Sequence, residues 1–172
     1  MKRKQTQKMV LLANLLAIGI VLNVIESLYI HISPVPGAKI GLANIVTLIA
    51  IYLYGVKEGV ILTLLRIFLV SIIIGTFLGP TFYLGLGGAA LSITAMGVLK
   101  KIDFFGIVGV SVMGSVFHAI GQIGIGIFVI GSTTIIYWLP VMLLISIPAG
   151  ILTGIISTKF LSVWQATHNE KN

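Results

Sequence analysis

The chain has 172 residues, of which 58% are hydrophobic and only 9% are charged, and its mean hydropathy is +1.15. Soluble domains carry about 25% charged residues, so this composition excludes a soluble globular enzyme and predicts an all-α membrane protein. The chain has no cysteine, which excludes disulfides and zinc–thiolate sites. The net charge of +7 resides at the ends of apolar segments, which indicates membrane topology rather than nucleic-acid binding.

Six apolar segments are expected to cross the membrane, since each approaches the roughly 20 residues that a span needs. The first is too long for the core of a secretory signal, which has about 7–15 residues. The dipeptide Gly79–Pro80 predicts a tight turn, and the fifth span is expected to be tilted or broken near Gly121–Gly126. The expected domain, 9–160, lies between a basic N-terminus, 1–8, and a tail, 161–172, and its spans are 9–30, 40–54, 59–78, 81–99, 104–130 and 136–160.

The basic residues predict the orientation, because cytoplasmic loops carry an excess of Lys and Arg. Nine of the eleven basic residues face the cytoplasm if both termini lie inside. We therefore expect a six-transmembrane-helix bundle, N-in and C-in, in the lipid bilayer of a bacterial plasma membrane. The two exceptions are Lys39, in an outer loop, and Arg66, within the third span.

Glu26 and Arg66 are the charged residues expected inside apolar segments. Insertion scales give a cost of about 2.5–3.5 kcal/mol for a charged side chain at a helix centre. Glu26 is the only acidic residue outside the expected loops and tail, so we expect the two to pair. The pair either fixes the register of two helices or faces a cavity and binds a polar ligand.

The outer loop 31–39 holds two prolines and a glycine and leads to Asn44 in the second span. Lys39 either reaches lipid headgroups or lines the mouth of an outward-facing pocket. In such a pocket, an anionic or oxygen-rich ligand would meet Lys39 and the backbone N–H groups that begin the second helix.

The fifth span carries a narrow polar stripe of Ser111, Ser115, His118 and Gln122, which fall within about 60° of one another at 100° per residue. Such a stripe either joins helices through hydrogen bonds, each worth about 0.6 kcal/mol, or lines a ligand site. We expect no metal site, because the three histidines of the chain lie in a loop, a span and the tail.

Small residues at four-residue spacing let membrane helices approach closely. Pairs of this kind are Gly150 and Gly154, Gly85 and Ala89, and Ala13 and Ala17. They predict packing within the bundle, and the alternative for Ala13 and Ala17 is a flat contact patch for a partner protein.

These residues together resemble the Gx transporter family, whose members carry the label heptaprenyl diphosphate synthase component I. The resemblance covers residues 9–160 and is most specific in the block Gly37-Ala38-Lys39-Ile40-Gly41-Leu42-Ala43-Asn44. The family is similar to the S components of energy-coupling-factor transporters, six-helix proteins that bind a vitamin near the outer face and couple to a T component and two ATPases. The resemblance implies an S-component-like ligand site of Glu26, Lys39, Asn44, Arg66, His118 and Gln122, and a partner contact at Ala13 and Ala17.

We therefore expect a substrate-binding subunit of a transporter, energised by partner subunits, for a cofactor-like molecule such as a flavin, quinone or isoprenoid precursor. We expect no intrinsic cofactor, no catalytic residue and no enzyme activity, because the Asp-rich magnesium motif of prenyl synthases is absent from the sequence. The resemblance also implies an alternative, a membrane subunit of flavin-based extracellular electron transfer or of a quinone or isoprenoid pathway, with a redox partner.

Overall fold

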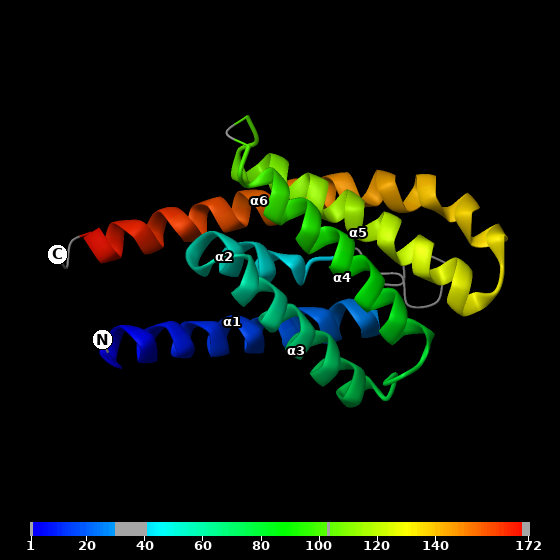
Figure 1. Cartoon of the computed structure of the whole chain (residues 1–172), viewed down its shortest axis with the longest axis horizontal. Helices are drawn as coiled ribbons and strands as arrows, with labels where there is room; N and C mark the ends of the chain where they lie inside the picture. Colours follow the sequence, from blue (N-terminus) through cyan, green and yellow to red (C-terminus); the bar gives the residue numbers. More distant parts are fainter. Residues whose placement is uncertain (1, 30–40, 103, 170–172) are drawn as a thin grey trace.

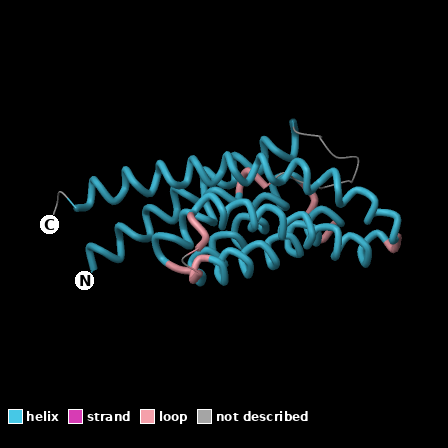
Figure 2. Tube along the Cα trace, turned by 90° about the horizontal axis from the view of Figure 1, so that it is seen from above, coloured by secondary structure: helices cyan, strands magenta, loops and turns pink. Residues whose placement is uncertain are grey.

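The computed structural model describes residues 2–29, 41–102 and 104–169, and within these ranges the chain is helical, without strands. The helices lie along one another in a single elongated bundle (Figures 1 and 2). In chain order they are α1 (Lys2–Tyr29), α2 (Asn44–Tyr54), α3 (Val56–Ile74), α4 (Pro80–Leu99), α5 (Ile107–Ile130), the 3₁₀ helix η1 (Thr133–Trp138) and α6 (Leu139–Asn169). Within the described residues, the expected all-α fold with six α-helices is confirmed, and the expected number of membrane crossings stays a prediction.

Four helical segments in the described part of the chain are long and apolar enough to cross a membrane. They are Gln5–Leu28, Pro80–Leu99, Ile107–Ile130 and Thr133–Thr167. In contrast, α2 has 11 residues, which gives a length of about 17 Å at 1.5 Å per residue. The hydrocarbon core is about 30 Å thick. Within the described residues, the second expected span, 40–54, is therefore a helix of about half the core thickness that begins at Asn44, and its crossing of the membrane stays a prediction.

Other boundaries also differ from the expected ones. The helix α5 runs unbroken from Ile107 to Ile130, so of the two alternatives for the fifth span the break near Gly121–Gly126 is wrong, and the tilt stays a prediction. The helix α6 continues to Asn169, so most of the expected tail, 161–172, is helical. The turn predicted at Gly79–Pro80 is confirmed in part: the backbone N–H of Gly79 donates a hydrogen bond of 3.0 Å to the carbonyl oxygen of Thr76, but the connection spans 75–79. Pro80 is the first residue of α4, where the missing N–H of proline costs nothing.

Glycines bring α4, α5 and α6 into close contact. A methyl group built on Gly121 of α5 would clash with the backbone carbonyl of Gly87 on α4. Methyl groups built on Gly150 and Gly154 of α6 would each lie 2.7 Å from a Cα atom of α5. The predicted packing role of Gly150 and Gly154 is confirmed, and these three helices form the densely packed side of the bundle.

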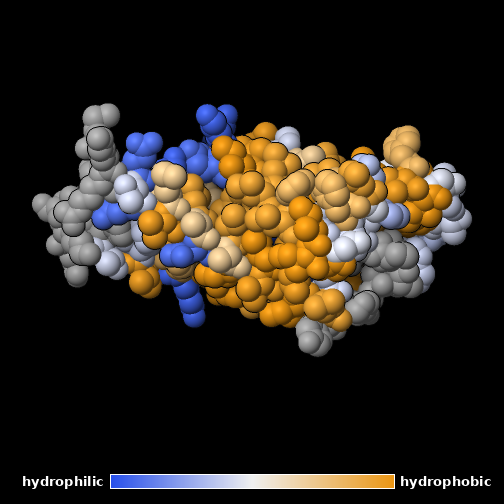
Figure 3. All heavy atoms as spheres, turned by 90° about the horizontal axis from the view of Figure 1, so that it is seen from below, coloured by the Kyte–Doolittle hydropathy of each residue, from blue (hydrophilic) through white to orange (hydrophobic). Residues whose placement is uncertain are grey.

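Charged side chains gather at one end of the bundle (Figure 3). There, Lys8 of α1 forms an ion pair with Glu58 in the first turn of α3. Lys100, which caps α4, donates a hydrogen bond of 2.7 Å to the carbonyl oxygen of Ile51 in α2. We call this the basic end, and the start of α1 and the end of α6 also lie here (Figure 1). That it faces the cytoplasm stays a prediction from the charge pattern.

Candidate functional site

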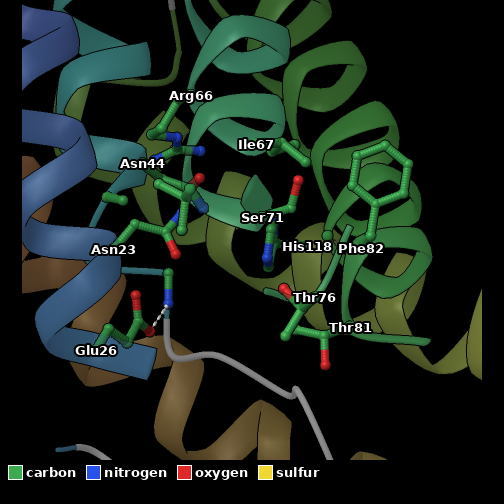
Figure 4. A pocket seen from close by; sticks show the side chains of 14 residues that line it. Asn23, Glu26, Asn44, Arg66, Ile67, Ser71, Thr76, Thr81, Phe82 and His118 are labelled. Atoms are coloured by element: carbon green, nitrogen blue, oxygen red, sulfur yellow. Dashed lines mark hydrogen bonds between the residues drawn. The ribbon is translucent and has the colours of Figure 1, made fainter. Parts of the chain in front are cut away.

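A polar pocket lies among α1, α3, α4, α5 and the start of α2 (Figure 4). It is in the half of the bundle away from the basic end, because its α1 residues, Asn23 and Glu26, are near the end of that helix. Among the described residues, α2 begins at Asn44 and is preceded by the non-helical residues 41–43. The open volume of the pocket is about 30 Å³, and a single water needs at least about 10–15 Å³. The lining residues are Asn23, Glu26, Gly41, Ala43, Asn44, Arg66, Ile67, Val70, Ser71, Thr76, Thr81, Phe82, Gly85 and His118.

Glu26 joins the end of α1 to the turn that begins α2. Its side chain is only 2% exposed, and its carboxylate accepts a hydrogen bond of 2.6 Å from the backbone N–H of Gly41. Gly41 has a φ of +91°, a conformation that favours glycine. A methyl group on Gly41 would also lie 2.9 Å from the amide nitrogen of Asn44. The turn that places Asn44 at the pocket therefore requires glycine.

Arg66 reaches the pocket from the middle of α3, about 15 Å along a helix that starts at the basic end. Its side chain is 2% exposed. Its Nε and Nη1 atoms have no hydrogen-bond partner among the residues that the structure describes. Gly19 of α1 packs against its aliphatic stem, where an added methyl would lie 3.2 Å from Cδ. The stem thus packs against α1, while two of the three guanidinium nitrogens have no acceptor among the described residues.

The expected ion pair between Glu26 and Arg66 is not formed in the described part of the chain, where no contact within 4.0 Å joins the two groups. They approach the same pocket from opposite sides (Figure 4), and Glu26 acts on the guanidinium only as a more distant opposite charge. The physical reason is the bond to Gly41, which holds the Glu26 carboxylate at the turn before α2.

Asn44 and His118 complete the polar wall. Both side chains are buried and line the pocket, and the amide nitrogen of Asn44 has no acceptor within the described ranges. Gln122, one turn beyond His118 on α5, is fully buried against Gly88 of α4 and does not line the pocket.

The structure therefore brings together four of the six residues proposed for the site, namely Glu26, Asn44, Arg66 and His118. It separates Gln122 from them, and Lys39 falls outside the described residues.

The predicted polar stripe on α5 divides between two neighbouring helices. Ser111 forms a hydrogen bond of 2.7 Å with Thr153 of α6, and Ser115 lies beside Gly150 of the same helix. His118 instead faces the pocket. One half of the stripe therefore joins helices, and the other half contributes to the candidate site.

Several pocket residues were not singled out by the sequence analysis. Asn23 precedes Glu26 by three residues, a spacing that places both on one face of a helix. The sequence alone therefore contained the information needed to predict Asn23 as a pocket residue. Thr76 and Thr81 flank the turn at Gly79, and Ser71 lies near the end of α3. Isolated hydroxyl groups of this kind are common in membrane helices, so composition alone did not distinguish these three.

A second cavity, which we call the apolar groove, lies between α1 and α3 and has a volume of about 280 Å³. It is lined by Met9, Leu12, Ala13, Leu16, Glu58, Ile61, Leu62 and Leu65. Both Ala13 and Ala17 are exposed on α1, so packing within the bundle does not explain them. Contact with a partner protein stays a prediction.

Comparison with curated proteins and with solved structures gives no significant match. A family model, described as heptaprenyl diphosphate synthase component I, matches residues 15–160. The matched region runs from within α1 to within α6 and contains every residue that lines the polar pocket. Because this region is most of the chain, the protein belongs to the heptaprenyl diphosphate synthase component I family.

Proposed function

We propose that this protein is the membrane-embedded ligand-binding subunit of a multi-subunit system, and that the polar pocket binds the polar part of a cofactor-like molecule. Arg66 is the observation that carries this proposal. An unpaired guanidinium is costly within a membrane, and charged residues kept there commonly mark ligand or ion sites. Arg66 adjoins a cavity and leaves two nitrogen atoms without an acceptor among the described residues, as a ligand site requires.

The size of the pocket limits what enters it in this conformation. Ligand pockets for drug-sized molecules span about 300–1,000 Å³, whereas this pocket offers about 30 Å³. A flavin, quinone or isoprenoid therefore places only a polar group here unless helices separate. Because Glu26 is bonded to Gly41, the end of α1 and the start of α2 are the elements whose joint displacement would enlarge the pocket.

The family description, component I, implies partner subunits. We propose that the chain works like the S components of energy-coupling-factor transporters, which the Gx transporter family resembles and in which a T component and ATPases supply the energy. The exposed positions Ala13 and Ala17, with the neighbouring apolar groove, provide an outward surface for that contact. Nothing in this sequence resembles an ATP-hydrolysing motif, so the energy source lies in the partners.

We further propose that this subunit does not itself catalyse prenyl transfer. Glu26 lies at the polar pocket, whereas Glu58 pairs with Lys8 at the basic end. Lys8 precedes Glu26 by 18 residues on α1, which corresponds to about 27 Å. These two carboxylates do not form the paired magnesium site expected of a prenyl synthase, so the reaction named by the family would belong to a partner subunit.

A second candidate function keeps the same pocket and changes the partners. The family description names isoprenoid diphosphate synthesis, which favours a membrane subunit of a quinone or isoprenoid pathway, or of the flavin-based extracellular electron transfer that uses such carriers. In that case, the pocket holds a quinone, flavin or isoprenoid group without moving it across the membrane.

Affinity purification from native membranes in mild detergent tests both candidates, with proteomics on the proteins and mass spectrometry on the extracted small molecules. Ala13→Leu with Ala17→Leu is the matched variant for partner contact, and Thr94→Leu, an exposed substitution on α4, is its control. The transporter proposal expects a T component, ATPases and one retained small molecule. Redox or prenyl-synthase partners without an ATPase favour the second candidate, and purification without any small molecule contradicts both.

A further inference from the structure

We propose that the polar pocket recognises an anionic oxygen group of its ligand, either a carboxylate or a phosphate, through Arg66 and Asn44. This inference rests on the proposed function and adds the chemical class of the group that enters the pocket. It follows from the kind of hydrogen-bonding atoms left open, from the charges around them and from the available space.

The open positions on Arg66 and Asn44 are donors. Nε and Nη1 of Arg66 and the amide nitrogen of Asn44 have no acceptor within the described residues. All three atoms are buried, and a buried N–H left without an acceptor is costly. The nearby carboxylate of Glu26 already accepts a bond from Gly41. A ligand that forms hydrogen bonds with these two side chains must therefore supply acceptor atoms such as oxygens.

The local charge favours an anion over a neutral acceptor. The guanidinium is always charged, and its planar set of N–H groups matches carboxylate and phosphate oxygens. Asn44 is the first residue of α2, so the partial positive charge of that helix N-terminus is directed at the pocket. Glu26 offsets part of this field from the opposite side without contacting Arg66. Hydrogen bonds to an ionised group are roughly twice as strong as neutral ones.

The volume of about 30 Å³ accommodates the oxygen atoms of a single ionised group rather than a ring or a chain. The hydrophobic part of an isoprenoid or lipid ligand would then remain outside the polar wall. The same anionic chemistry has two sources, a soluble ligand and the headgroup of an anionic lipid, and the experiment must separate them.

The test uses the full chain in nanodiscs of zwitterionic lipid, with thermal unfolding followed through Trp138 and Trp164. The anionic probes are inorganic diphosphate, isopentenyl diphosphate and, for the carboxylate class, acetate; the neutral probes are isopentenol and riboflavin. We expect an upward shift of the unfolding midpoint by about 3 °C with the diphosphates or with acetate at concentrations well above the Kd, and no shift with the neutral probes. The same unfolding measurements in phosphatidylglycerol nanodiscs, without added probes, show whether an anionic lipid headgroup stabilises the protein.

Two variants and one control assign the effect to the pocket. Arg66→Met removes the guanidinium and keeps the apolar stem, and Asn44→Asp replaces a donor by a negative charge. Each should abolish the shift caused by the diphosphates. Ser157→Ala is the control, because Ser157 is also buried and unpartnered in the described structure but does not line the pocket, so it should keep the shift. If Arg66→Met does not fold, the response of Asn44→Asp to the diphosphates shows whether they bind in the pocket.

The outcomes separate this inference from the proposed function. Equal stabilisation by isopentenol or riboflavin, unchanged in Asn44→Asp, overturns anion recognition and leaves a ligand-binding subunit. Stabilisation by phosphatidylglycerol alone, lost in both pocket variants, supports the anionic chemistry and assigns it to a lipid. If no anionic probe or lipid acts, the inference is wrong, and the small molecules retained on purification then decide the proposed function independently.

Discussion

Two successive turns of α3 each carry a buried polar side chain, but only one of these side chains has its hydrogen-bond partner within the described protein. Thr63 is buried, and its hydroxyl forms a hydrogen bond of 2.7 Å with the hydroxyl of Thr47 on α2. Arg66, three residues later, is equally buried, but its Nε and Nη1 have no partner among the described residues, and it adjoins a cavity. Within a membrane, polar groups need internal partners. The difference distinguishes a polar group that joins helices from one that awaits a ligand.

The same contrast recurs along α5. Ser111 is bonded to Thr153 of α6, whereas His118, two turns later, lines the polar pocket. Gln122 fits neither class, since its amide has no partner within the described ranges and does not line the pocket, and the structure offers no explanation for it. Most of the buried polar residues that the sequence proposed therefore fall into two groups: those hydrogen-bonded to another helix, and those that line the pocket.

The largest effect on stability is expected for Glu26→Gln. This change removes the opposite charge that acts on the buried Arg66 from across the pocket. Because the two groups are not in contact, the cost should be below the 3–5 kcal/mol of a broken buried ion pair, at about 2 kcal/mol. The variant should lose about that much free energy of unfolding, measured by denaturant titration in detergent.

The matched double variant, Glu26→Gln with Arg66→Met, should recover most of this loss because neither charge remains. Strictly additive losses would show that the two groups do not interact across the pocket.

Gly41→Ala is expected to cost about 1–2 kcal/mol because of its positive φ, and it should also weaken ligand binding by displacing Asn44. Gly131→Ala is the control, since Gly131 has a φ of +69° and open space around an added methyl. Both variants should lose stability in thermal unfolding, but only Gly41→Ala should weaken the binding of the retained ligand. Equal binding in the two variants would contradict the role of this turn.

A smaller effect is expected for Thr63→Val, which breaks the hydroxyl pair on α3. Hydrogen bonds between membrane helices contribute about 0.6 kcal/mol on average, with a maximum near 1.7. The variant should lose stability within that range and keep wild-type ligand affinity, measured by unfolding and by binding on the same sample. A large loss of affinity would show that the pocket extends to this turn and would remove the contrast with Arg66.

The smallest effect is expected at the basic end. Exposed ion pairs contribute about 0.2–1 kcal/mol, so Lys8→Gln should lower stability only slightly, and less so at high salt. The hydrogen bond from Lys8 lowers the pKa of Glu58. The contribution of the pair is therefore present above the unfolded pKa of about 4.3 and lost as pH falls through the lowered value. Unfolding midpoints of both proteins at pH 7 and pH 3 check this, and a difference that grows at pH 3 would contradict it.

The sequence predicted the membrane class and much of the site because charged groups in apolar segments are rare and costly. Glu26 and Arg66 stood out for that reason and do reach one pocket. The prediction of a direct ion pair was wrong because it matched opposite charges and did not consider backbone N–H groups. The N–H of Gly41 is such a donor, and it binds the carboxylate of Glu26. The start of α2 at Asn44 was missed because 40–54 is mostly apolar, so hydropathy does not show where the helix begins.

A density map of the protein purified from native membranes would test the central claim most directly. We predict non-protein density in contact with the guanidinium of Arg66 and the amide of Asn44, with a connected acceptor group. A map in which Arg66 bonds to Glu26 or to backbone carbonyls, with the pocket filled by side chains, would contradict the account and make Arg66 a structural residue like Thr63.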